Sequence, residues 1–222
     1  MKKDLQRDIF LSGEGDAWFN RNKVDASLMD SQPDLLYPLL CDLPLEDGLN
    51  SSVVEVGCGQ GLRLKGLANK RGWKIMGLDP SVEAVSAACQ LGVDAQVGTA
   101  EKLPYPSHSI DLLIYGFCLY LCDRDDLFQI SSEAHRVLKP AGWLAILDFW
   151  SPHQRSNVYH HRDGILSHKM NLPEMFSWHP SYVITDHRLR HHSLQAHTDD
   201  PDEWVAATLI RRLDHSDSFT DS

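Results

Sequence analysis

The sequence predicts an α/β fold with a mostly parallel sheet and an antiparallel pair of strands at one edge. From residue 51 onward, short apolar runs alternate with helical patterns, and Gly or Pro residues separate them. Strands that alternate with helices form right-handed βαβ units, in which consecutive strands lie parallel. Near the carboxyl end, the runs "YVITDHRLRHHSL" and "EWVAATLIRRL" follow each other without a convincing helix between them, which indicates the antiparallel pair.

The spacing of apolar residues along the chain predicts the secondary-structure elements. Runs rich in β-branched residues predict strands at residues 53–56, 74–78, 95–97, 110–115 and 143–149. Helical periodicity predicts helices at 62–70, 82–91 and 126–138, with Ser81 as the N-cap of the second helix and Gly92 as its end. The chain then divides into a mainly helical N-terminal cap (1–50), a core (51–150), an insertion with the C-terminal strand pair (151–213) and a disordered tail (214–222).

Composition narrows the class of protein. The 222 residues carry a formal net charge of -10 and contain no basic block, which is unfavourable for binding nucleic acid. No apolar h-region follows the two N-terminal lysines, and no apolar run reaches the roughly 20 residues that span a bilayer. The five cysteines are scattered and odd in number, as expected for reduced thiols. We therefore expect a cytoplasmic α/β enzyme.

A glycine-rich turn follows the first strand, in "VVEVGCGQGL" at residues 53–62. Gly57, Gly59 and Gly61 stand between the apolar run and the first residues of a helical pattern. Such a turn points free N–H groups and the positive end of a helix dipole at one place, where an anionic or polar part of a nucleotide-like ligand would lie. A tight strand-to-helix turn without a ligand would also use glycines.

Further stretches follow the turn in a characteristic order. Asp79 ends the second strand in "KIMGLDPS", where it could accept ribose hydroxyls or stand at a helix N-terminus. "VGTAEKLPY" after the third strand, "SIDLLIYGFCLYLCD" and "HRVLKPAGWLAILDF" complete the set. In this order and spacing, the five stretches resemble the class I S-adenosylmethionine-dependent methyltransferases, especially the small-molecule subgroup that includes quinone-biosynthesis enzymes. The resemblance covers about residues 50–150.

This resemblance implies a Rossmann-like methyltransferase fold with a seven-stranded sheet, helices on both faces and an N-terminal helical cap. It also implies S-adenosylmethionine as cofactor and a small-molecule acceptor, quinone-like or, from a faint likeness of the opening residues, a sugar. Carried over position by position, it places Glu55, Gly57, Gly59 and Gly61 beside the aminoacyl group and Asp79 beside the ribose. Pro80, Ala100 and Glu101 would lie beside the adenine, and Tyr115 and Gly116 beside the sulfonium end.

The chemistry itself asks for few catalytic groups, because methyl transfer is an in-line displacement at a carbon that the sulfonium already activates. Candidate bases stand at the carboxyl ends of the strands, where open α/β sheets bind ligands. Tyr120 could transfer a proton or pack against the cofactor pocket, and it stands where many relatives have His. Asp148 could be a base or a turn residue. Thr99 replaces an Asp usual in the family, and Ala141 replaces the first glycine of an L-K-P-G-G turn.

Two segments outside the core could complete the site. In "GEGDAWFNRN" of the cap, Arg21 could bind the methionine carboxylate, or the stretch could be an amphipathic surface helix. Nine of the twelve histidines lie between His153 and His197, after the fifth strand. We expect this segment to cover the acceptor, with His160 and His161 as candidate catalytic groups, although any single histidine could simply cap a turn.

Two functions other than methyl transfer would use parts of the same sequence pattern. An oxidoreductase that uses a nicotinamide dinucleotide would need G-x-G-x-x-G, and Leu62 occupies the position of its third glycine. A protein that binds S-adenosylmethionine without catalysis, as a sensor or partner subunit, would keep the same motifs. No metal is expected, since Cys118-x3-Cys122 has no second cysteine pair and His187-x3-His191 shares one strand face only loosely.

Overall fold

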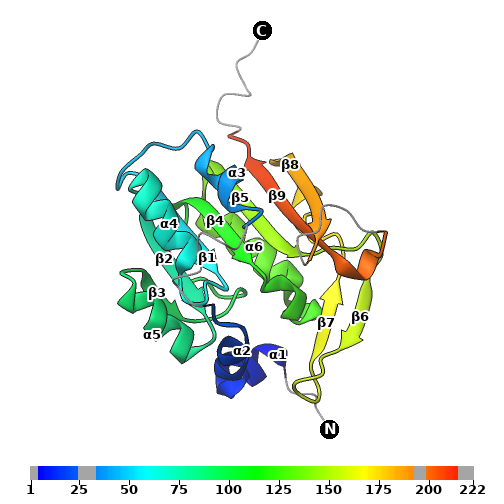
Figure 1. The fold of residues 1–222 in the computed structure, drawn as a ribbon. Helices are drawn as coiled ribbons and strands as arrows, with labels where there is room; N and C mark the ends of the chain where they lie inside the picture. The colour runs from blue at the N-terminus through cyan, green and yellow to red at the C-terminus, as the bar shows by residue number, and fades with distance from the viewer. Residues whose placement is uncertain (1–4, 25–33, 193–198, 215–222) are drawn as a thin grey trace.

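A seven-stranded sheet forms the centre of the protein, in a computed structural model that describes residues 5–24, 34–192 and 199–214. The strand order is β3-β2-β1-β4-β5-β9-β8 (Figure 1). The five strands from β3 to β5 are parallel, whereas β9 is antiparallel to both of its neighbours. The strand bounds are β1 Ser52–Val56, β2 Lys74–Asp79, β3 Asp94–Val97, β4 Ile110–Gly116, β5 Leu138–Phe149, β8 Tyr182–His191 and β9 Trp204–Arg212.

Helices cover both faces of the sheet, which explains why its central strands are apolar along their whole length. One face packs against α3 (Tyr37–Cys41), α4 (Leu62–Arg71) and α5 (Val82–Gln90), and the other against α6 (Leu127–Val137) and α7 (Glu174–Ser177). The predicted N-cap of α5 is confirmed, since the Ser81 hydroxyl accepts a hydrogen bond from the Ala84 N–H at 3.0 Å. Gly92 follows α5 with φ +83°, a left-handed conformation suited to glycine at a helix end.

The predicted fold is confirmed: the core strands are parallel, and an antiparallel pair of strands forms one edge of the sheet. The largest change in bounds concerns β5, which begins at Leu138 rather than at Trp143. Its first residue pairs with Ile110, and a register shift separates this pair from the next one, Leu112 with Trp143. The apolar run alone does not reveal this extension, because a bulge interrupts the pairing and Pro140 lies inside it.

The N-terminal cap consists of α1 (Gln6–Ile9), a π-helical turn (Phe10–Glu14) and α2 (Gly15–Asn22). Gly13 in the π-helical turn has φ +137°, so the helix bends between α1 and α2. The buried Gln6 side chain donates to the carbonyls of Leu121 and Leu166 at 2.7 and 3.1 Å and accepts from the Leu166 N–H at 2.6 Å. The cap is therefore fixed to the rest of the domain by backbone groups far away in the sequence.

A two-stranded hairpin, β6 (Arg155–Val158) with β7 (Leu166–Lys169), lies between β5 and α7. Figure 1 shows it beside α1 and α2 at the lower edge of the sheet. Sequence analysis missed it because "RSNV" and "LSHK" lack the apolar alternation of a half-buried strand, and every residue of β6 is exposed. The predicted tail at 214–222 lies outside the described residues, apart from Asp214.

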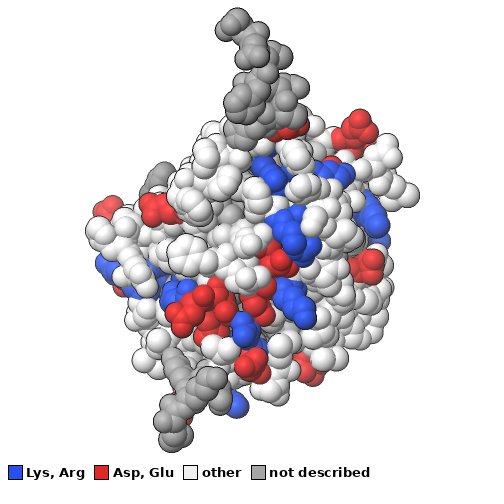
Figure 2. Space-filling model, turned by 180° about the vertical axis from the view of Figure 1, so that it is seen from behind, with Lys and Arg blue, Asp and Glu red and all other residues white. Residues whose placement is uncertain are grey.

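The surface carries charges of both signs. On the face drawn in Figure 2, Lys and Arg side chains lie singly or in small groups between Asp and Glu. Among the described residues, no helix is both long enough and apolar enough to cross a bilayer. Nor do His, Cys, Asp and Glu side chains in these parts of the chain form a group of three or more that could hold a metal ion.

Ala141 adopts the left-handed conformation that the family turn would give to glycine, with φ +57°. We expect Ala141→Gly to stabilise the fold by about 0.5 kcal/mol, because removing Cβ relieves more strain than the added chain entropy costs. This would raise Tm by about 1–2 °C in a thermal unfolding scan. Ala145→Gly in the buried centre of β5 is the matched control and should lower Tm. An Ala141→Gly variant that unfolds earlier than the wild type would show that the alanine side chain contributes packing that outweighs the strain.

Candidate functional site

A pocket lies at the carboxyl ends of β1, β2 and β4 and encloses about 760 Å³ of empty space, part of it open to solvent. Residues 56–57, 79–80, 98–101 and 116–118 line it from the sheet side. The cap covers it with Arg7, Phe10, Gly15 and Trp18. Parallel α/β sheets bind ligands at this edge, so the pocket is the candidate functional site.

The three glycines of the turn serve two different purposes. Gly57, Gly59 and Gly61 all have positive φ, at +75°, +52° and +76°. A Cβ on Gly57 would lie 2.8 Å from that of Cys118, and one on Gly61 would lie 2.8 Å from Val93, so packing excludes side chains there. At Gly59 a Cβ would meet nothing within 4 Å. Gly59 therefore provides a left-handed backbone beside open space, which a ligand could approach closely.

Asp79 joins the turn to the end of β2. Its Oδ2 accepts a hydrogen bond from the Gly59 N–H and its Oδ1 one from the Ser81 N–H, both at 2.9 Å. The side chain is 9% exposed and lines the pocket. Burial raises the pKa of Asp79, and the two backbone N–H groups oppose that rise. A carboxylate has about four acceptor positions, so Asp79 can still accept hydrogen bonds from hydroxyl groups in the pocket.

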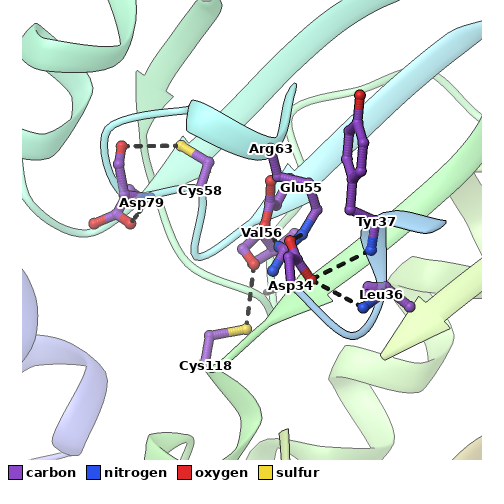
Figure 3. Close-up of polar contacts among 10 residues, drawn as sticks. Asp34, Leu36, Tyr37, Glu55, Val56, Cys58, Arg63, Asp79 and Cys118 are labelled. Atoms are coloured by element: carbon purple, nitrogen blue, oxygen red, sulfur yellow. Dashed lines mark hydrogen bonds and ion pairs between the residues drawn. The ribbon is translucent and has the colours of Figure 1, made fainter. Parts of the chain in front are cut away.

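Glu55, the polar residue near the end of β1, lies behind the turn in a buried ion pair (Figure 3). Its Oε1 accepts from Nη1 of Arg63, and Nε of Arg63 also donates to Asp34 at 2.5 Å. Oε2 of Glu55 is buried and has no hydrogen-bond partner among the described residues. Burial raises the pKa of Glu55 to about 7, although Arg63 opposes the rise.

Ala100 and Glu101 form the wall beyond β3. Ala100 is buried, and Oε1 of Glu101 accepts a hydrogen bond from the Thr99 hydroxyl at 2.6 Å. Thr99, which replaces the Asp usual in the family, thus holds the neighbouring carboxylate at the pocket wall. Pro80 lines the pocket next to Asp79.

The cap approaches the end of β2 closely. A Cβ on Gly15 would lie 2.9 Å from the Phe10 carbonyl oxygen and 3.1 Å from the Ser81 nitrogen. Asp16 accepts hydrogen bonds from the Ser81 hydroxyl at 2.6 Å and from the Glu83 N–H at 3.0 Å, and these bonds lower its pKa. On the opposite side of the pocket, Arg7 donates to both carboxylate oxygens of Asp126 at 3.0 and 2.9 Å.

Besides Glu55, the side chains of two predicted cofactor contacts, Tyr115 and Arg21, do not line the pocket. The Tyr115 ring is fully buried on the α6 and α7 face of the sheet and stacks on Phe176 with ring centroids 6.1 Å apart. The neighbouring Gly116 does line the pocket. Arg21 donates to Glu14 at 2.6 Å and to the Tyr159 hydroxyl at 2.7 Å. Its guanidinium group joins the cap to the hairpin.

Two of the candidate bases are held by other groups. The Tyr120 hydroxyl accepts from Trp18 Nε1 at 3.2 Å, its ring lies edge-on to Phe149, and burial raises its pKa. Asp148 is 2% exposed and accepts from the backbone N–H groups of residues 119, 120 and 149 at 2.9, 3.3 and 2.8 Å. Burial raises the pKa of Asp148 to about 7. Its carboxylate fixes the loop after β4 and is not among the groups that line the pocket.

His160 and His161 lie at exposed positions in the loop between β6 and β7, outside the pocket lining. Instead, the hairpin brings Tyr159 and Ile165 against Phe10 and Tyr120 in a small apolar cluster. His168 is buried and its Nδ1 is 2.8 Å from the Ser156 hydroxyl. His197 lies outside the described residues. The hairpin thus packs against the cap, and neither His160 nor His161 lines the pocket.

Sequence analysis missed several residues that line the pocket. Phe117 and Cys118 follow β4 directly, and residues 121–123, 126 and 130 continue the same wall. Their position at the carboxyl end of a predicted parallel strand was a usable signal. Phe10 and Arg7 lie in the cap, where only the packing of the cap on the sheet brings them to the site.

Comparison with known proteins places the core in a family. The family model of the methyltransferase domain matches residues 54–146. A ubiquinone/menaquinone biosynthesis C-methyltransferase from Rubrivivax gelatinosus is 36% identical over 99 residues, which are 43% of this chain and 38% of that protein. The chain therefore spans well under two thirds of the length of this curated relative.

Solved structures share the fold. A SAM-dependent methyltransferase from Methanosarcina mazei superposes with a TM-score of 0.66 at 20% identity and covers 81% of this chain and 99% of its own. The 1,6-didemethyltoxoflavin-N1-methyltransferase of Burkholderia thailandensis gives a TM-score of 0.65 at 18% identity, over 94% of this chain and 87% of its own. The fold is thus the Rossmann-like methyltransferase fold.

If Asp79 binds a ribose, replacing it should weaken cofactor binding. We expect Asp79→Asn to weaken the binding of S-adenosylhomocysteine by roughly 1–3 kcal/mol, because a charge-assisted hydrogen bond is lost. Titration calorimetry on folded protein measures this loss. Asp111→Asn is the matched control, because Asp111 also accepts from a backbone N–H, that of Ser52 at 2.8 Å, but lies at the amino end of β4. Equal affinities in the wild type and Asp79→Asn would refute the ribose assignment.

Proposed function

We propose that this chain, whose core matches the methyltransferase-domain family over residues 54–146, transfers a methyl group from S-adenosylmethionine to a small-molecule acceptor. The observation that carries the proposal is the hydrogen bond between Gly59 and Asp79 at the edge of the pocket, with open space beside Gly59. This arrangement offers a ribose acceptor and a bare backbone turn side by side, as a nucleoside with an aminoacyl group requires.

The pocket suits the parts of this cofactor. The unpartnered Glu55 Oε2 is an acceptor in need of a donor, which the aminoacyl ammonium would supply above the turn at Gly57, Gly59 and Gly61. Asp79 would hold the ribose, and Pro80, Ala100 and Glu101 would lie along the adenine. Gly116 would border the sulfonium end. When bound, the cofactor supplies a methyl carbon that is already activated for displacement.

The acceptor would lie against an apolar wall formed by Phe10 and Trp18 of the cap and by Phe117 after β4, all of which line the pocket. Phe117 has φ +49°, a strained conformation for a residue with a large side chain, and its ring lies edge-on to Phe149. An aromatic wall of this kind favours a small acceptor with an apolar or planar part. The Rubrivivax relative is a ubiquinone/menaquinone biosynthesis C-methyltransferase, which supports a quinone-like acceptor over a sugar.

Catalysis would depend on positioning of the acceptor rather than on a strong general base. Neither Tyr120 nor Asp148 lines the pocket: the Tyr120 hydroxyl accepts from Trp18, and the Asp148 carboxylate accepts from three backbone N–H groups. The chain's contribution would be to hold the acceptor in line with the methyl group and to exclude water under the cap. Such a site serves an acceptor whose nucleophilic atom needs little help to lose its proton.

A two-step assay tests the proposal. S-adenosylmethionine and S-adenosylhomocysteine should raise Tm of the protein, whereas NAD should leave it unchanged, since Leu62 occupies the third glycine position of the dinucleotide motif. A metabolite extract incubated with methyl-labelled cofactor should then yield a labelled product. Stabilisation without any labelled product would favour the rival function, a protein that binds the cofactor without catalysis.

Variants locate the acceptor. If the apolar wall binds it, Trp18→Ala should raise KM for the acceptor by about tenfold, as expected for the loss of a large buried contact of about 1.4 kcal/mol, while affinity for S-adenosylhomocysteine changes little. Trp18→Phe keeps the wall and removes the hydrogen bond to Tyr120, so it should retain most activity. His160→Ala and His161→Ala test the histidines. Turnover lost in these two variants and kept in Trp18→Ala would move acceptor binding from the wall to the hairpin loop.

A further inference from the structure

Arg63 connects two carboxylates on different parts of the chain behind the glycine turn (Figure 3). It lies in the first turn of α4 and donates to Glu55 of β1 and to Asp34, whose other oxygen accepts from the N–H groups of Leu36 and Tyr37 at 2.9 and 3.3 Å. The side chains of Glu55 and Arg63 are only 3% and 14% exposed. Two anions share one cation, so when both carboxylates are ionised the cluster has one negative charge in excess.

The cluster is also short of one hydrogen-bond donor. Glu55 Oε1 is taken by Arg63, while Oε2 is buried without a partner among the described residues. A Cβ on Gly116, which lines the pocket, would lie 2.5 Å from Glu55 Oε1 and 2.8 Å from Arg63 Nη1. Only the bare backbone of Gly116 thus separates the ion pair from the pocket.

We propose that Arg63 is a positioning residue that holds Glu55 ionised for the ammonium group of the bound cofactor, and that Asp34 counteracts Arg63. This inference rests on the proposed function, because the ammonium belongs to the aminoacyl part of S-adenosylmethionine. Arg63 does not contact the ligand itself, since Nη1 faces Glu55 and Nε faces Asp34. It acts through the charge and the orientation of the Glu55 carboxylate.

The electrostatic surroundings fix the direction of each effect. Burial raises the pKa of Glu55 to about 7, Arg63 opposes this, and Asp34 and Asp79 add to it. Cys58 in the turn and Cys118 after β4 are also near, and burial raises the pKa of both thiols, which keeps them neutral. Removing Arg63 should therefore raise the pKa of Glu55 further, whereas removing the charge of Asp34 should lower it.

The experiment compares two ligands over pH 5.5–8.5 by titration calorimetry. S-adenosylhomocysteine carries the ammonium, and 5′-methylthioadenosine lacks the whole aminoacyl part. In the wild type, affinity for the first should fall as pH drops through about 7 and Glu55 becomes neutral, while affinity for the second stays level. Arg63→Met should move this midpoint to higher pH and weaken S-adenosylhomocysteine about fivefold at pH 7, because a rise of about one pKa unit lowers the ionised fraction of Glu55 from about one half to about one tenth. Asp34→Asn, which keeps the Oδ1 acceptor, should move the midpoint to lower pH.

Opposite shifts distinguish this role from support of the fold, since loss of a structural ion pair would weaken binding in the same direction in both variants. Arg63→Lys should restore the wild-type midpoint by restoring the charge. Arg71→Met on the same helix is the control, because Arg71 contacts Asp47 and backbone carbonyls away from the pocket and should leave the midpoint unchanged. Shifts in the same direction, or an equal loss for both ligands in Arg63→Met, would overturn the inference while leaving the proposed function intact. A wild type that binds neither ligand would overturn the proposed function itself.

Discussion

A chain of hydrogen bonds through Asp79 holds the candidate site together. The Gly59 and Ser81 N–H groups bind its two carboxylate oxygens, and the Ser81 hydroxyl both caps α5 and donates to Asp16 of the cap. One side chain at the end of β2 thus sets the distance between the glycine turn, helix α5 and the cap. These bonds fix the turn beside the open space at Gly59, together with the Gln60 side chain, which bonds to the backbone N–H and carbonyl of Val24. A ribose hydroxyl would share a carboxylate that already organises three segments.

Two buried carboxylates at the same sheet edge differ in function because they differ in their hydrogen-bond partners. Asp148 is satisfied by three backbone N–H groups and fixes the loop after β4. Glu55 is paired with a guanidinium group and retains one oxygen without a partner in the described part of the chain. Burial raises the pKa of both to about 7, so the pKa alone does not tell them apart. The unpartnered Oε2 of Glu55 does distinguish them, because a buried polar atom without a hydrogen-bond partner is costly unless a ligand supplies that partner.

The order of strands and helices could be predicted because each buried strand of the core is a short apolar run and each helix has a clear period. The glycine turn, Asp79 and the Ala100–Glu101 stretch could be placed at one edge for the same reason. The face of the sheet on which Tyr115 lies could not be predicted, since β4 is buried on both sides and its sequence shows no alternation of apolar and polar residues. The Tyr115 ring packs against Phe176 on the α6 and α7 face and does not line the pocket.

The partners of Arg21 and the exposure of His160 and His161 were also beyond the sequence. Arg21 could equally have met a ligand carboxylate, but folding of the hairpin brings Tyr159 within 2.7 Å, and Glu14 lies about two helical turns earlier in the chain. The hairpin strands are polar and short, so neither their pairing nor the direction of their loop follows from periodicity. Contacts that depend on two irregular segments docking together are set by tertiary packing alone.

The segments that cover the pocket lie outside the stretch that matches the family. Phe10 and Trp18 of the cap line the pocket, and Tyr159 and Ile165 of the hairpin pack in a cluster with Phe10. The sheet side of the pocket, in contrast, lies within residues 54–146. These covering segments meet the core through side chains such as Gln6 and Asp16 that bind backbone groups. Bonds to the backbone do not depend on the side chains of the core. The cap and the hairpin can therefore diverge at little cost to the domain beneath them, and under the proposed function acceptor preference would evolve separately from cofactor binding.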